Sequence, residues 1–187
     1  MSHYFGIEEI KTKLIVVVGM SLSGEEFCKR YRMGSDEYHK VYNLADYTAL
    51  TKTIVSNNLI EISVKVRCLV DALSSQGIKF PVEKSITTYG AGSCADGKKK
   101  MKGFRFICNK VIHADGFNLD FIGRKSLPKE MVWWSGDITV SGAYQGERWE
   151  FFFSVLDWCD EVLEFLKLAE AQIDKIQGSS RDLQLHS

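Results

Sequence analysis

The sequence predicts a mainly α-helical protein, an up-down bundle of four to five helices with one β-hairpin before the last helix. Three observations predict this class. Hydrophobic residues make up 45% of the 187 residues, which is enough to form a buried core. Only two prolines occur, which leaves room for long helices. Apolar residues also recur at helical spacing in two long stretches, 54–73 and 155–177.

The composition excludes several functional classes. The chain has 24 basic and 24 acidic residues, so any binding to nucleic acid must come from a local patch. The five cysteines form no CxxC pair, which argues against a zinc site or a disulfide framework and for reduced thiols. The apolar run 14–20 is too short to cross a membrane. We therefore expect a cytoplasmic protein without membrane contact, metal or cofactor.

Residues 5–31 predict one helix or two. The β-branched run from Ile15 to Val18 is also compatible with a buried strand, because periodicity cannot separate the two over so few residues. Helix is the favoured interpretation. Ser23 lies three residues before Glu26, which is the spacing of a capping box and predicts a second helix start.

The longest periodic segment is 36–75. Its second half contains no glycine or proline, and Gly77 is suited to end the helix. Two pairs of opposite charge at i,i+4 spacing should support it, Glu61 with Lys65 and Arg67 with Asp71. Seven apolar residues at helical spacing predict its buried face: Val55, Leu59, Ile62, Val66, Leu69, Val70 and Leu73.

The remaining elements follow in order. Residues 79–103 are rich in glycine and lysine and predict a mobile loop, and 117–135 look irregular. Two strands within about 137–153 flank the turn Tyr144–Gly146 and predict the hairpin. The last helix should run from about 155 to 177. The sequence thus predicts a single domain, 1–177, and a flexible tail, 178–187.

A short helix predicted over 104–113 carries the functional argument. Its polar residues Arg105, Asn109 and His113 are spaced four apart, which places them in one stripe on an otherwise apolar helix. Burying such a stripe without partners is costly, so we expect it at a cleft or an interface. A histidine held by Asn109, with Arg105 paired to a carboxylate such as Glu61, would be the purely structural interpretation.

The catalytic interpretation of the stripe is metal-free RNA cleavage. Such a reaction needs a group that moves protons near neutral pH, for which His113 is suited. It also needs positive charge at the transition state, for which Arg105 is suited because a guanidinium grips phosphate with two hydrogen bonds. Asn109 would orient the imidazole or hold a phosphate oxygen. One copy of the chain supplies few catalytic groups, so we expect a symmetric dimer in which two stripes face each other and form one active site.

Arg105 followed by His113 on a helix of a small chain resembles the HEPN superfamily, whose hallmark is Arg-x(4–6)-His. Residues 108–114, Cys-Asn-Lys-Val-Ile-His-Ala, are similar to a signature of uncharacterised bacterial proteins. Seven residues separate Arg105 from His113 here, one more than the hallmark allows, and Lys110 could supply the charge instead. The resemblance implies a metal-independent ribonuclease of toxin or antiviral type, dimeric with its motifs face to face. The alternative that the resemblance allows is a non-catalytic binding or scaffold module.

A lysine cluster precedes this helix. It could contact a nucleic-acid backbone, although a solvated loop is the simpler interpretation of so short a run. The partners we expect are RNA, a second copy of the chain and, as the resemblance implies, an antitoxin or other protein. The cluster consists of Lys98, Lys99, Lys100 and Lys102.

Overall fold

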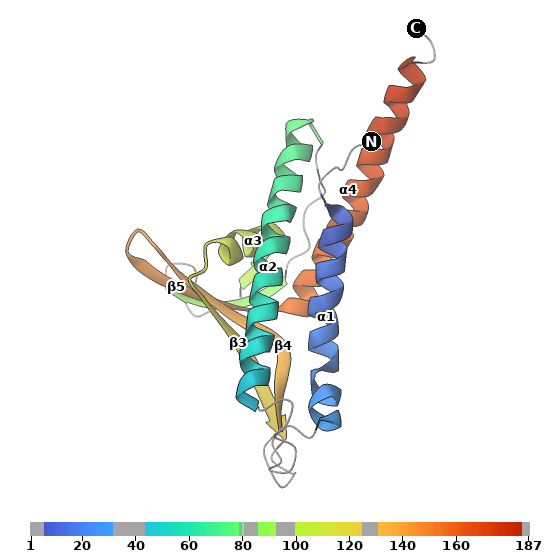
Figure 1. Ribbon diagram of the computed structural model, residues 1–187. Helices are drawn as coiled ribbons and strands as arrows, with labels where there is room; N and C mark the ends of the chain where they lie inside the picture. Colours follow the sequence, from blue (N-terminus) through green and yellow to red (C-terminus); the bar gives the residue numbers. More distant parts are fainter. Residues whose placement is uncertain are drawn as a thin grey trace.

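The protein combines helices with an antiparallel sheet (Figure 1). The residues described contain four helices and one five-stranded sheet, so the prediction of a mainly helical bundle with one hairpin is wrong. The fold is of the mixed α+β kind, in which helices pack on one antiparallel sheet. The computed structural model describes residues 6–31, 44–78, 80, 86–92, 100–124 and 131–184.

Helix α1 (Ile7–Arg30) is continuous and includes the run from Ile15 to Val18, so helix was the correct choice there. Acidic residues in its first turn and basic residues in its last turn complement the helix dipole. The predicted second start at Ser23 is wrong. The Ser23 hydroxyl donates to the backbone oxygen of Gly19 (2.6 Å), four residues back in the same helix.

Helix α2 (Leu44–Ser75) confirms its predicted face, since all seven of the expected apolar residues are buried. Gly77 has a φ of 79°, which only glycine adopts without strain. There the N–H of Ile78 donates to the oxygen of Leu73 (3.2 Å) and that of Gly77 to Ser74 (3.0 Å), which ends the helix in a Schellman motif.

Ion pairs join α1 and α2, which run side by side in opposite directions (Figure 1). Lys13 of α1 contacts Glu61 of α2 at 2.6 Å, and Glu9 contacts Lys65. The predicted pair of Glu61 with Lys65 is therefore wrong, because each of these residues pairs with a residue of α1. The Arg67–Asp71 pair does occur, at 3.9 Å.

The sheet has the order β2-β1-β5-β4-β3 with all neighbouring strands antiparallel. Its centre is the hairpin of β4 and β5, joined at Gln145 and Gly146, both with positive φ as in a type I′ turn. The predicted hairpin is confirmed and is longer than expected. The strands are β1 (Ile86–Gly92), β2 (Lys100–Lys102), β3 (Gly116–Arg124), β4 (Met131–Tyr144) and β5 (Glu147–Ser154).

Two stretches predicted to lack structure contribute strands. The predicted loop 79–103 contains β1 and β2, and the predicted irregular stretch 117–135 contains β3 and the start of β4. Phe117 and Leu119 alternate with Asn118 and Asp120, which is the strand period of two. A register shift after Leu119 breaks this alternation, so the signal covers only a few residues.

Helix α4 (Val155–Gln184) begins directly after β5, as predicted. It continues beyond 177, so the predicted tail is helical as far as 184, and 185–187 lie outside the described residues. The main hydrophobic core lies between the helices and the inner face of the sheet. Its largest fully buried side chains include Trp134, Trp158 and Phe153.

Candidate functional site

Helix α3 (Phe104–Ile112) positions the residues singled out in the sequence. Its buried side consists of Phe104, Ile107, Cys108 and Val111, and it packs mainly against α2. The helix is shorter by one residue than predicted. His113 is its C-terminal cap, with φ −100° and ψ 10°, and donates its backbone N–H to the oxygen of Asn109 (3.2 Å).

The predicted polar stripe is not a buried network. Asn109 and His113 are exposed and Arg105 is half-buried. Arg105 and His113 lie about 12 Å apart along the helix axis, given the rise of about 1.5 Å per residue. One copy of the chain therefore does not bring the two residues to a common phosphate.

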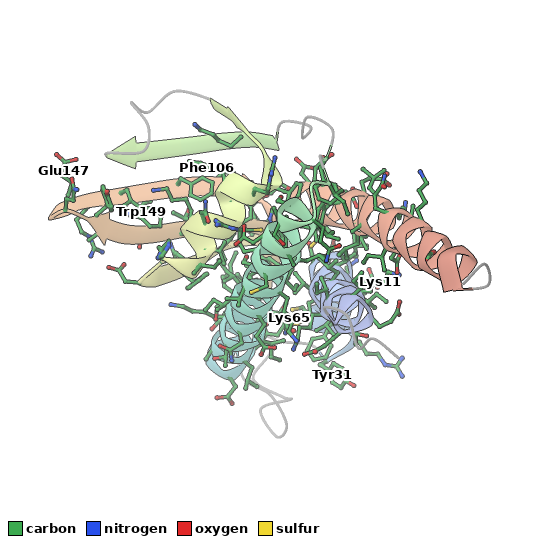
Figure 2. All side chains as sticks on the ribbon, turned by 90° about the horizontal axis from the view of Figure 1, so that it is seen from above. Lys11, Tyr31, Lys65, Phe106, Glu147 and Trp149 are labelled. Carbon is green, nitrogen blue, oxygen red and sulfur yellow. The ribbon has the colours of Figure 1, made fainter. Side chains whose placement is uncertain are left out.

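A different set of residues does come together around α3, from β2, from α3 itself and from β5. The Lys102 ammonium lies 4.5 Å from the centre of the Phe106 ring, and the Lys110 ammonium lies 5.8 Å from the same centre. Lys110 also lies 4.3 Å from the centre of a Trp149 ring. Figure 2 shows Phe106 and Trp149 close together beside α3 and the β4–β5 hairpin. We call Lys102, Phe106, Lys110 and Trp149 the lysine–aromatic cluster.

Residues of β4 and β5 pack against this cluster and hold it in place. Trp149 of β5 is 2% exposed, and the Phe106 ring meets Phe151 edge-on with the centres 6.0 Å apart. Gly142 of β4 lies against Trp149, since a Cβ there would be 2.7 Å from ring atom Cε2 and 2.9 Å from the His113 oxygen. The indole and the end of α3 are thus held against a strand that has no side chain at this position.

The segment after His113 is fixed to the same hairpin. Asp115 donates its backbone N–H to the oxygen of Ser141 in β4 (2.9 Å). Arg148 of β5 holds the Asp115 carboxylate with two nitrogens, at 2.9 and 3.5 Å. This pairing neutralises the acidic group nearest in sequence to His113, so the basic character of the surface comes from Lys102 and Lys110.

The sequence did not reveal the cluster, because its members lie in three different elements, β2, α3 and β5. Lys110 was a possible substitute for Arg105, and Lys102 belonged to the lysine run. The spacing of Phe106 and Lys110, four residues, was the available signal, because it places both on one side of a helix. Lys102 lies at the end of β2, before this helix begins, so the helical pattern did not include it. Of the rest of the run, Lys98 and Lys99 lie outside the described residues, and Lys100 is in β2 with its side chain not described.

Other features of the described residues lie apart from α3. A pocket of about 320 Å³ opens between α1 and α2, lined by Met20, Ser23, Gly24, Phe27, Tyr47, Leu50, Thr51 and Ile54. None of the predicted site residues lines it. Within the described ranges, no three histidine, cysteine or acidic side chains are grouped to hold a metal ion, and no helix has the length and apolarity to cross a bilayer.

Comparison with known proteins adds no relative. No protein-family model matches the chain, and no curated protein and no solved structure is significantly similar to it.

Proposed function

We propose that this protein is a non-catalytic binding module that contacts RNA through the lysine–aromatic cluster beside α3. The observation that carries the proposal is the pair of ammonium groups, Lys102 and Lys110, at the ring of Phe106. Two like charges repel each other, and an anion that contacts both relieves this repulsion. A phosphodiester chain supplies such anions in series.

The charges of the cluster are available to a ligand. Neither Lys102 nor Lys110 forms an ion pair with the part of the chain that the structure describes. The aromatic rings hold the ammonium groups by cation–π attraction without neutralising them. The exposed Asn109 and His113 lie on the same helix, where an amide and an imidazole can hydrogen-bond to sugar or base. RNA is preferred over a free anion because these groups extend over two helical turns.

The test is binding of a fluorescent single-stranded RNA, followed by anisotropy at several salt concentrations. Lys110→Met removes the charge but retains an unbranched side chain over Trp149. The double variant with Lys102→Met and Lys110→Met should bind the RNA about tenfold more weakly. The slope of log affinity against log salt concentration should fall by roughly 0.7 per lysine removed. Lys52→Met is the matched control, since Lys52 is an exposed lysine of α2. Equal binding by the double variant and the wild type would refute the proposal.

One observation favours a second function, metal-independent RNA cleavage by His113. The imidazole is exposed, makes no hydrogen bond or ion pair with a described residue, and follows Lys110 by three positions. His113 would move the proton and Lys110, in place of Arg105, would contact the phosphate.

The two functions separate in one assay. Incubation of a mixed RNA pool with EDTA should leave the RNA intact if the module only binds. If the wild type leaves 2′,3′-cyclic phosphate ends and His113→Ala does not, the protein is a nuclease. A His113→Ala protein that cleaves as fast as the wild type excludes His113 from the chemistry.

A further inference from the structure

Helix α1 presents an apolar stripe that no described part of the chain covers. Ile15 is 71% exposed and Leu22 is 69% exposed, the two highest values among the large hydrophobic side chains described. They are seven residues apart, which is two helical turns, so they lie on one face. Gly19 lies between them. Figure 2 shows α1 between α2 and α4 at one side of the helical layer.

Nothing within the described part of a single chain requires a glycine at position 19. Glycine inside a helix is destabilising relative to alanine, because it loses more backbone freedom on folding. A Cβ at Gly19 would meet nothing within 4 Å, so no neighbour in the same chain requires its absence. A second helix that packs against the stripe would use the missing side chain, because small residues allow two helix backbones to approach closely.

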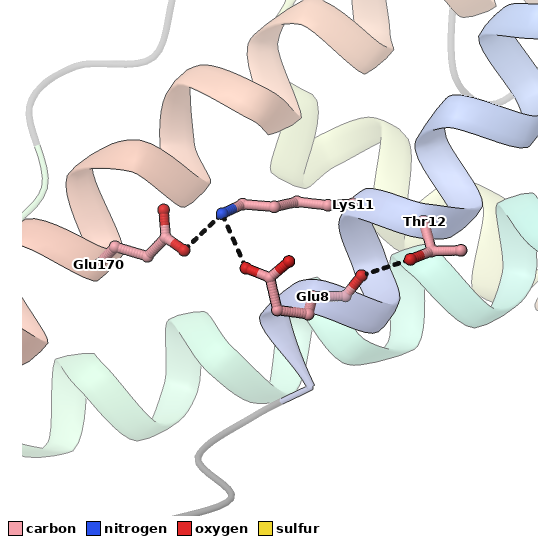
Figure 3. A network of polar contacts seen from close by, with 4 residues as sticks. All are labelled: Glu8, Lys11, Thr12 and Glu170. Carbon is pink, nitrogen blue, oxygen red and sulfur yellow. Dashed lines mark hydrogen bonds and ion pairs between the residues drawn. The ribbon is translucent and has the colours of Figure 1, made fainter.

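Charged residues continue the stripe at both ends. Near its start Lys11 contacts Glu8 at 3.1 Å, and near its end Lys29 contacts Glu26 at 2.6 Å and Glu25 at 3.1 Å. Lys11 also contacts Glu170 of α4 at 2.5 Å, which holds its ammonium beside the stripe (Figure 3). In each of the pairs within α1 the acidic residue precedes the basic one in the sequence. When two copies of α1 pack antiparallel, Glu8 and Glu26 of one copy therefore each lie opposite a basic residue of the other.

We propose that α1 is the interface of a homodimer in which two copies of α1 pack antiparallel about an axis between residues 18 and 19. Ile15 then faces the partner's Leu22, Glu8 faces the partner's Lys29, and Lys11 faces the partner's Glu26. Each i,i+3 pair thereby becomes half of a four-charge network. Parallel packing would instead place each of these charges against its own copy, which is repulsive.

The size of the interface sets the expected affinity. A helix of 24 residues is about 36 Å long, and one pair of such helices buries less than the roughly 800 Å² per partner of a standard interface. We therefore expect a dimer that forms with rising protein concentration and dissociates on dilution. This surface is separate from α3, so the dimer does not depend on the RNA proposal.

The first test is sedimentation velocity over a concentration series. Ile15→Glu and Leu22→Glu should each raise the dimer dissociation constant by about tenfold or more, because a charge then faces an apolar side chain. Val64→Glu is the matched control on α2, where the valine is 42% exposed, and it should leave the dissociation constant unchanged. Circular dichroism verifies that each variant is folded.

The second test separates this partner and register from others. Lys29→Glu should weaken the dimer, and adding Glu8→Lys should restore it, although both changes disturb the charge pairs within each copy. Gly19→Ala should stabilise the helix and yet weaken the dimer. A wild type that stays monomeric at every concentration overturns the proposal. A dimer that persists in Ile15→Glu and Leu22→Glu, or one that Glu8→Lys fails to restore, also overturns it.

Discussion

The two halves of the β4–β5 hairpin differ in what covers them. The half that adjoins α4 contains Ile138 and Phe153, which have no exposed surface. The half toward the turn ends at Tyr144, which is 64% exposed, and its indole Trp149 lies under the ammonium of Lys110. In Figure 1 this second half extends away from α1 and α4.

The difference shows how one pair of strands serves two purposes. Where several elements cover the inner face, aromatic rings are enclosed by other apolar groups and contribute to stability. Where the short helix α3 covers it, lysine stems complete the cover and their charges stay at the surface. The same residue types therefore make a core at one end and a binding surface at the other.

The largest loss of stability should come from a change in the half of the hairpin that adjoins α4, which we call the enclosed half. Phe153→Ala should lower the free energy of unfolding by about 3–5 kcal/mol, because it leaves a cavity among rigid neighbours. Phe152→Ala is the matched control, since the half-buried Phe152 faces the opposite side of the sheet and should cost clearly less. Chemical denaturation measures both. Equal losses would mean that the outer face is covered as well, and the contrast between the two faces would be wrong.

An intermediate effect is expected at the half toward the turn. Gly142→Ala places a methyl group against Trp149 and the His113 oxygen, which should cost about 1–3 kcal/mol and loosen the end of α3. Tryptophan fluorescence and denaturation measure the two consequences. Ala143→Val, at the exposed neighbouring position, should change stability by less than about 0.5 kcal/mol. If Gly142→Ala changes stability as little as Ala143→Val does, the close packing of β4 against Trp149 does not hold the lysine–aromatic cluster in place.

The smallest effect concerns a carboxylate of the enclosed half. Burial raises the pKa of Asp137 above its usual value of 3.8, and the charges of Asp120 and Asp157 raise it further. The folded state therefore binds this proton more tightly, so ionised Asp137 destabilises the fold at neutral pH and the penalty fades as the pH falls.

Asp137→Asn should accordingly raise stability at pH 7, by about 1 kcal/mol or less for so accessible a group. The advantage should shrink as the pH falls, because the wild-type carboxyl then gains its proton, and it should be gone below the usual pKa of 3.8. Thermal unfolding at a series of pH values checks this. An advantage that is the same at every pH would trace the effect to something other than the charge.

The helices show what a sequence can reveal. In α2 each residue expected to be buried is buried, because the spacing of apolar residues is a local property that one helix displays on its own. The end of α2 at Gly77 and the turn at Gly146 follow from the backbone freedom of glycine. The sequence also located α3, although His113 caps the helix and does not extend it.

The sheet and the candidate site depended on tertiary structure. Strands β1 and β3 are weak in sequence because each is stabilised by hydrogen bonds to a distant partner. The sequence by itself located the helical regions of α1, α2 and α4 and showed which side of α2 is buried, although it left one helix or two open over 5–31 and ended α4 near 177. Only the fold decided that Lys110 lies over Trp149, 39 positions away, because pairing across β4 and β5 brings that indole beneath α3.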